Sequence, residues 1–168
     1  MTKFSTDHPL PPRHLELIGE IAVQWSFIEF LMLEAISEIT EVDPTKGIFL
    51  TTNLGYQSRL SLLQVYGNSL KEKGMPEGAE FLKLLEALSQ SYGIRNKYVH
   101  SHYLSNGIAS DPTLSNVRLK GKLQIVEEAI TVATLEADSD RLYEAGDRFL
   151  AFLQRFDLCI GPSRKTPT

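Results

Sequence analysis

The chain has 168 residues, of which 42% are hydrophobic and 23% are charged, and its formal net charge is -4. This size and apolar content predict one compact domain with a substantial hydrophobic core. The negative charge argues against a protein that coats nucleic acid by bulk electrostatics, although a small basic pocket stays compatible with it. The single cysteine, Cys159, cannot form an internal disulfide, which fits a reducing compartment and a structural thiol.

Residues 1–11 are polar and proline-rich and predict a flexible tail without the apolar core of a signal peptide. The most apolar run, residues 21–36, is interrupted by Gln24, Glu29 and Glu34 and is shorter than the ~20 residues that a membrane span needs. We therefore expect a soluble cytoplasmic protein with no membrane partner. Residues 12–160 are expected to form its single domain, and residues 161–168 a second flexible tail.

The first predicted helix starts at Pro12, which suits a first helical turn because its missing N–H is not needed there. Its seam follows alternating steps of three and four residues: Leu15, Ile18, Ala22, Trp25, Glu29, Met32, Ile36 and Ile39. A second apolar row consists of Ile21, Ile28, Leu31 and Ala35. Because this helix is apolar nearly all round between Trp25 and Ile36, we expect it to need two packing partners, either two neighbours in its own bundle or one neighbour and another subunit.

Asp43-Pro44 and Gly47 predict a connection, followed by a second helix over about residues 53–73 with Gly74 as its stop. Pro76 opens a third helix, whose seam is Phe81, Leu85, Leu88, Tyr92, Arg95, Val99 and His102. Trp25 is expected in the core, and Gly93 at a position of close packing.

The segment after the third helix is irregular. Residues 104–116 predict a loop, and residues 117–120, 123–126 and 129–133 are strand-like. Together they indicate a small hairpin or an irregular excursion. Thr134 is expected to cap the last helix, whose predicted buried face is Leu142, Ala145, Phe149, Phe152 and Phe156. The expected fold is therefore all-α: a four-helix up-down bundle with a small loop or β-hairpin insertion before the last helix.

Arg95, Asn96 and His100 are the residues most suggestive of chemistry. Arginine offers a permanently charged fork for phosphate, and histidine exchanges a proton near neutral pH. Beside an amide, these groups suit cleavage of RNA without a metal, in which the ribose 2′-hydroxyl attacks the adjacent phosphate. Arg95 and His100 lie about 140° apart around an ideal helix. They converge only if the arginine bends round the helix or if a second copy of the motif faces the first.

Arg95-Asn96, three further residues and His100 resemble the arginine–polar–x–x–x–histidine motif of the HEPN superfamily, which consists of helical bundles with this motif on a late helix. The segment from Trp25 to Glu29 also resembles uncharacterised bacterial relatives. The resemblance covers roughly residues 12–158, and its specific motif is six residues long.

This resemblance implies a homodimeric endoribonuclease that cleaves RNA in a shared cleft, with a role in toxin–antitoxin or defence systems. It implies catalytic roles for Arg95 and His100 and a supporting role for Asn96. The implied partners are a second copy, RNA and an antitoxin protein, and no cofactor or metal is implied. The alternative function is a non-catalytic HEPN-like module that binds a nucleotide or a protein partner.

Further residues near the motif are candidates for binding. His102 offers a second histidine at a longer spacing, and Tyr98 or Tyr103 would stack on a base. His100 and His102 would share a face as metal ligands only in an extended chain, and no cysteine pair or Glu-x-x-His motif accompanies them.

Two interpretations stay open for the carboxylate on the first seam, and three for the motif itself. Glu29 either points toward a wet edge or forms a buried ion pair with Arg59 or Arg95. The motif fits a catalytic or ligand site, a helix cap that bonds the last carbonyls, or a polar dimer interface.

Overall fold

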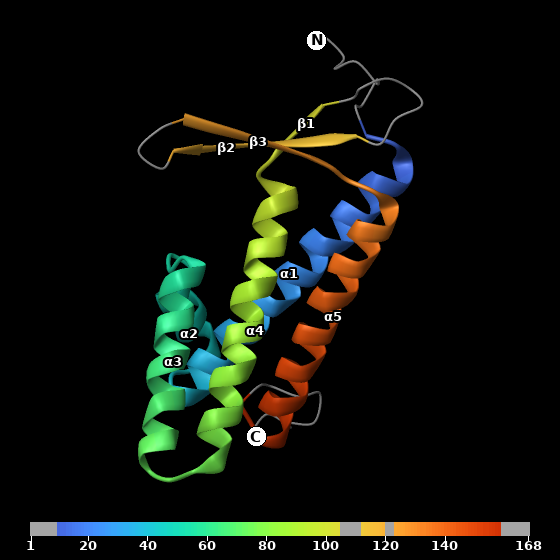
Figure 1. The fold of residues 1–168 in the computed structure, drawn as a ribbon. Helices are drawn as coiled ribbons and strands as arrows, with labels where there is room; N and C mark the ends of the chain where they lie inside the picture. The colour runs from blue at the N-terminus through green and yellow to red at the C-terminus, as the bar shows by residue number, and fades with distance from the viewer. Residues whose placement is uncertain (1–9, 105–111, 120–122, 159–168) are drawn as a thin grey trace.

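The computed structural model describes residues 10–104, 112–119 and 123–158. Within them, four long helices form a bundle and a three-stranded sheet lies across one end of it (Figure 1). This confirms the expected all-α bundle with a small β insertion before the last helix. In chain order the elements are α1 (Pro12–Ile39), α2 (Pro44–Thr51), α3 (Tyr56–Glu72), α4 (Pro76–Val99), β1 (His102–Leu104), β2 (Thr113–Leu119), β3 (Leu123–Ala129) and α5 (Val132–Arg155).

α4 runs antiparallel to α3, as expected for a short connection, and α5 runs antiparallel to α4 after the chain has formed the sheet (Figure 1). α1, in contrast, runs parallel to α3 (Figure 1). Trp25 packs against Tyr56, and farther along both helices Ile36 shares a hollow with Leu63 and Tyr66. The short helix α2 makes this possible, because it carries the chain back before α3 begins (Figure 1). The expectation of a plain connection around Pro44 and Gly47 was therefore wrong. Proline is tolerated in a first helical turn, and Gly47 packs so closely on Ser37 that a Cβ would clash.

The buried face of α1 is turned relative to the expected seam. Leu15 is exposed and Ala22 is only partly buried, whereas Leu17, Ile21 and Ile28 are buried. The reason is that α1 packs against α5 on one side and α3 on the other, so the second apolar row lies at the centre of the bundle. Trp25 is 1% exposed, which confirms its expected place in the core. None of the described helices has an apolar stretch long enough to cross a bilayer.

The turn between α3 and α4 ends α3 at the expected glycine. Gly74 has a φ of 76°, and its N–H donates to the Lys71 carbonyl at 3.0 Å. The N–H of Met75 donates to the Leu70 carbonyl at 3.0 Å, which completes a C-terminal cap of the Schellman type. Glycine adopts this left-handed conformation without the steric cost of a Cβ.

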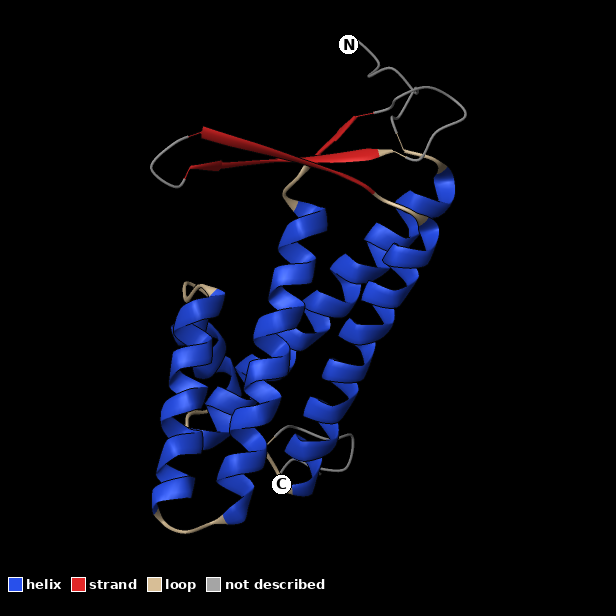
Figure 2. Ribbon diagram, viewed as in Figure 1, coloured by secondary structure: helices blue, strands red, loops and turns tan. Residues whose placement is uncertain are grey.

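The three strands form an antiparallel sheet in the order β1-β2-β3 (Figure 2). Tyr103 lies opposite Leu114, and Val117 lies opposite Ile125, so the expected hairpin is confirmed. The loop expected over residues 104–116 was wrong at both ends, where Leu104 and residues 113–116 belong to strands; residues 105–111 lie outside the described part of the chain.

The N-terminal cap of α5 is Thr131 rather than the expected Thr134. Thr134 donates its N–H to Thr131 Oγ1 at 3.1 Å, and Thr131 donates its N–H to Thr134 Oγ1 at 3.0 Å. This reciprocal capping box starts the helix at Val132, within the segment 129–133 that was expected to be strand. Four of the five expected core positions of α5 are buried: Leu142, Ala145, Phe149 and Phe152. The fifth, Phe156, is partly buried and lies just beyond the end of the helix.

The predicted terminal tails are largely outside the described residues, which exclude 1–9 and 159–168. Leu10 is 5% exposed and joins the core, and Pro11 is the N-cap of α1. The packed part of the chain therefore begins slightly before residue 12.

Candidate functional site

The side chains of Arg95, Asn96 and His100 come together at the C-terminal end of α4. Arg95 and Asn96 lie in its last turn, and His100 is its C-cap. Arg95 Nη1 donates to Asn96 Oδ1 at 3.0 Å and makes a short hydrogen bond to Nε2 of His100. The arginine therefore bends round the helix, which is one of the two routes to convergence that the sequence left open. The convergence occurs within one chain and needs no second copy.

The contact between Arg95 and His100 fixes the state of the imidazole in this arrangement. A guanidinium only donates hydrogen bonds, so His100 Nε2 must accept, and the proton of the neutral ring is then on Nδ1. That lone pair is engaged by Arg95 in this structure, so Nε2 could take up a proton only after the guanidinium moves away from it. His100 is exposed, and Arg95 and Asn96 are half-buried, so a ligand can approach the three groups from solvent.

The helix end is capped by other groups, which weakens the reading of this motif as a cap. The Ser101 hydroxyl donates to the Lys97 carbonyl at 2.5 Å, and the Tyr103 hydroxyl donates to the Tyr98 carbonyl. The N–H of His100 donates to the Asn96 carbonyl at 3.3 Å. These bonds satisfy carbonyls that every helix leaves unpaired at its C-terminus. The side chain of Arg95 is left to contact its two polar neighbours.

Tyr98 fastens the end of α4 to α5. Its side chain is fully buried, and its hydroxyl donates to Asp138 Oδ2 at 2.7 Å. Asp138 Oδ1 accepts a second bond from Arg141 at 3.0 Å. Burial, and then the bond to the Asp138 carboxylate, raise the pKa of Tyr98 well above its ordinary value. A fully buried ring cannot stack on a base, so the structure gives Tyr98 a positioning role instead of the expected binding role.

We expect Tyr98→Phe to lower the free energy of unfolding by about 1–2 kcal/mol near neutral pH, since a bond to a charged acceptor is lost. The protonated hydroxyl of Tyr98 has a raised pKa in the folded state. The contribution of this hydroxyl to the free energy of unfolding is therefore complete below a pH of about 10 and is lost as the pH rises further. Urea unfolding between pH 8 and 11 should show a steeper loss of stability in wild type than in Tyr98→Phe. Parallel pH curves would contradict this account.

Tyr103 and His102 lie on β1, immediately beyond the helix. Tyr103 is half-buried, and burial raises its pKa to about 12. Its hydroxyl donates a hydrogen bond to the Tyr98 carbonyl. His102 is exposed and lies opposite Ser115 in the sheet, so it leaves the helical seam on which the sequence placed it. Of the two histidines, the structure brings only His100 into contact with Arg95.

Glu29 lies away from the motif, among α1, α2 and α3. Its Oε1 is 3.8 Å from Nη1 of Arg59, whose side chain is 11% exposed, whereas that of Glu29 is 36% exposed. Arg59 Nη2 also donates to the Thr51 carbonyl at the end of α2, at 3.4 Å. Both expectations for Glu29 therefore hold in part: its carboxylate is partly exposed to solvent, and it pairs with Arg59. Its role is structural.

Three aromatic rings support α4 one turn before the motif. Tyr92 of α4 stacks on Tyr56 of α3 with ring centroids 4.1 Å apart. Trp25 of α1 packs against both rings, at 5.1 Å from Tyr56 and 5.4 Å from Tyr92. Burial raises the pKa of Tyr56 to about 12. The cluster fixes α4 relative to α1 and α3, and it thereby sets the place of Arg95 and Asn96.

Gly93 is exposed, and a Cβ on it would meet nothing within 4 Å, so the expected close packing at this glycine was wrong. We therefore expect Gly93→Ala to raise the free energy of unfolding by about 0.5–1 kcal/mol, through the lower backbone entropy of the unfolded chain. Gly78→Ala in the same helix is the matched control, because its Cβ would lie 2.5 Å from the backbone nitrogen of Lys71. Urea unfolding should show opposite signs for the two variants, and destabilisation by Gly93→Ala would contradict the open surface.

Sequence reasoning missed three residues that hold the site in place. Asp138 bonds Tyr98, Glu128 on β3 pairs with Lys97 at 2.8 Å, and Ser101 bonds the last turn of α4. Only Ser101 left a local signal, because a serine four residues after a helical carbonyl can bond it. The other two contacts join residues far apart in the sequence, and no spacing rule predicts them.

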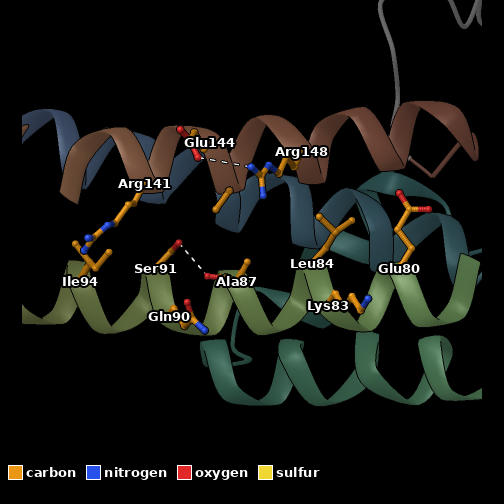
Figure 3. A pocket seen from close by; sticks show the side chains of 11 residues that line it. Glu80, Lys83, Leu84, Ala87, Gln90, Ser91, Ile94, Arg141, Glu144 and Arg148 are labelled. Atoms are coloured by element: carbon orange, nitrogen blue, oxygen red, sulfur yellow. Dashed lines mark hydrogen bonds and ion pairs between the residues drawn. The ribbon is translucent and has the colours of Figure 1, made fainter. Parts of the chain in front are cut away.

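A separate hollow of about 280 Å³ lies between α4 and α5 (Figure 3). Both of its arginines are paired with carboxylates: Arg148 lies 3.7 Å from Glu144, and Arg141 is bonded to Asp138. On the α4 side of the hollow, the Ser91 hydroxyl donates a hydrogen bond to the Ala87 carbonyl of the same helix (Figure 3). The lining residues do not include the motif, so this hollow is not part of the candidate site.

Over the described parts of the chain, no three His, Cys, Asp or Glu residues are grouped as metal ligands. Comparison with protein-family models, with curated proteins and with solved structures found no match. The resemblance to the HEPN superfamily therefore stays a prediction from the motif Arg95-Asn96-x-x-x-His100.

Proposed function

We propose that this protein is a HEPN-like, metal-independent endoribonuclease that uses Arg95, Asn96 and His100. One observation carries the proposal: the guanidinium of Arg95 contacts both the amide of Asn96 and the Nε2 atom of His100 at a solvent-accessible helix end. This arrangement combines a fixed cation with an acceptor for a proton, and both are needed for attack of a 2′-hydroxyl on phosphate.

In the proposed reaction, an RNA phosphate binds the guanidinium of Arg95 and draws it away from His100. Nε2 of His100 then takes the proton of the ribose 2′-hydroxyl, and the 2′-oxygen forms a bond to phosphorus. The bond from phosphorus to the 5′-oxygen breaks, and that oxygen receives a proton from the imidazolium or from water. The products are a 2′,3′-cyclic phosphate and a free 5′-hydroxyl. Arg95 stabilises the charge that builds on the phosphate, and Asn96 accepts a hydrogen bond that keeps the guanidinium near the helix end as it turns from His100 to the phosphate.

Preorganisation of the site supports this proposal. Tyr98 joins α4 to α5 through Asp138, and Lys97 joins the same helix end to β3 through Glu128. Rotation of the last turn would break both contacts. A site held in this way has less to reorganise when charge develops on the substrate.

The proposal is tested by incubating purified protein with mixed RNA in the presence of a chelator, beside Arg95→Ala and His100→Ala. We expect cleavage by wild type, a large loss in both variants and products with 5′-hydroxyl ends. Relief of toxicity on expression of either variant would support a role as a toxin. Equal cleavage by all three proteins would mean a contaminating nuclease and would end the enzyme proposal.

A second candidate function is binding of a nucleotide or a protein partner through the same residues without chemistry. It is favoured by the hydrogen bond from Arg95 to Nε2 of His100, which occupies the lone pair that a catalytic base would need. Saturable binding of a nucleotide that depends on Arg95, without any cleavage of RNA, would select this alternative. The homodimer that the resemblance implies would be seen as a dimer in sizing experiments at micromolar concentration.

A further inference from the structure

Four large apolar side chains of α1 and α5 are exposed, and two of them, Phe27 and Tyr143, line a common hollow between these helices. Val23, Phe27 and Phe30 of α1 are 71%, 46% and 50% exposed, and Tyr143 of α5 is 64% exposed. The three α1 residues are spaced by four and three positions, so they lie on one stripe of the helix. We call this surface the α1–α5 face.

The α1–α5 face is hollowed between the two helices. A depression of about 180 Å³ lies there, lined by Phe27, Ile28, Tyr143 and Leu150 among others. Gly146 lets the helices approach closely below it, since a Cβ on Gly146 would lie 3.2 Å from Cγ1 of Ile28. The depression is predominantly apolar, and its two exposed aromatic residues come one from each helix. Such a hollow accepts an apolar side chain from another molecule.

The rim of the α1–α5 face is negatively charged. Glu20 is on the same stripe of α1 as Phe27. On α5, Asp147 lines the depression, and Asp140 lies one turn before Tyr143. All three are exposed, and none has an ion pair within the described residues. Arg13, at one end of the face, forms ion pairs with two carboxylates, Glu16 at 2.8 Å and Glu136 at 2.9 Å. Its charge is therefore compensated and does not offset that of the rim.

From this combination we propose that the α1–α5 face docks a basic amphipathic helix of a partner protein. Apolar side chains spaced at i, i+3, i+4 and i+7 would enter the hollow, and lysines or arginines beside them would face Glu20, Asp140 and Asp147. A second copy fits less well, because a two-fold contact through this face would bring the same carboxylates together. Nucleic acid and anionic lipid are repelled by the same rim. The proposal does not depend on the ribonuclease activity.

The test uses a fluorescent synthetic helix of leucine and lysine with one apolar stripe, measured by anisotropy against the full-length protein. We expect saturable binding, and about tenfold weaker binding by Asp140→Lys/Asp147→Lys. Val23→Lys should also weaken binding by about tenfold. Val65→Lys is its matched control, because Val65 is an equally solvent-exposed valine of α3, at 68% against 71%. Both variants add one positive charge at a surface position, so a stability effect should be shared between them.

Several outcomes would overturn the proposal. One is equal affinity for a helix of leucine and glutamate, which would mean that the rim does not select charge. Another is an equal effect of Val23→Lys and Val65→Lys, which would place binding elsewhere. Self-association of the wild type at micromolar concentration that Val23→Lys abolishes would assign the face to a second copy. An unchanged affinity in Asp140→Lys/Asp147→Lys would likewise contradict the assigned carboxylates.

Discussion

Replacing His100 with alanine is expected to reduce the rate of RNA cleavage at least about 100-fold, since the proton acceptor for the 2′-hydroxyl is removed. The free energy of unfolding should stay within about 0.5 kcal/mol of wild type, because this side chain is exposed and lies beyond the end of α4. The measurement is the initial rate with one RNA oligonucleotide in chelator, together with urea unfolding of the same preparations.

Two further variants make the result specific to the proposed roles. His102→Ala removes an exposed histidine two residues farther along, which does not contact Arg95, and it should retain nearly full activity. Arg95→Lys keeps the charge but loses the planar fork, so it should lose most of the activity as well. Equal losses in His100→Ala and His102→Ala would contradict the assignment of the base to His100.

Replacing Trp25 with alanine is expected to lower the free energy of unfolding by about 3–5 kcal/mol, because a large buried ring is lost and a cavity is left. Trp25 packs against Tyr56 and Tyr92, so the loss removes contacts among three helices at once. Trp25 is the single tryptophan of the chain, and circular dichroism is therefore the appropriate probe of unfolding.

The same variant should also reduce RNA cleavage, because Tyr92 would lose the partner that holds α4 one turn before Arg95. Tyr143→Ala is the matched control, as it removes an aromatic ring that is 64% exposed and should change stability by no more than about 0.5 kcal/mol. A loss below about 1 kcal/mol in Trp25→Ala would show that the aromatic cluster does not support the bundle.

Periodicity predicted the parts of the fold where one helix face is clearly apolar. The buried face of α5 and the stop of α3 at Gly74 follow from spacing and backbone preference, which act locally. α1 was harder, because it is apolar nearly all round, and its orientation depends on where α3 and α5 pack. Helix α2 was missed because Pro44 and Gly47 indicate a turn equally well.

For the candidate site, the sequence predicted the residue types and their place at the end of α4. It could not decide how the side chain of Arg95 would turn, since that depends on contacts rather than on spacing. It also expected Tyr98 to stack on a base, because its buried partner Asp138 lies 40 positions away in the chain and left no local signal. The homodimer and the RNA substrate stay predictions of the resemblance.

The central claim is that His100 and Arg95 activate the ribose 2′-hydroxyl of RNA. The most direct measurement compares an RNA oligonucleotide with its 2′-O-methyl counterpart in chelator, with mass analysis of the products. Wild type is expected to cleave only the RNA and to leave 2′,3′-cyclic phosphate ends, with cleavage lost in His100→Ala. Cleavage of the 2′-O-methyl oligonucleotide, or undiminished cleavage by His100→Ala, would contradict the claim.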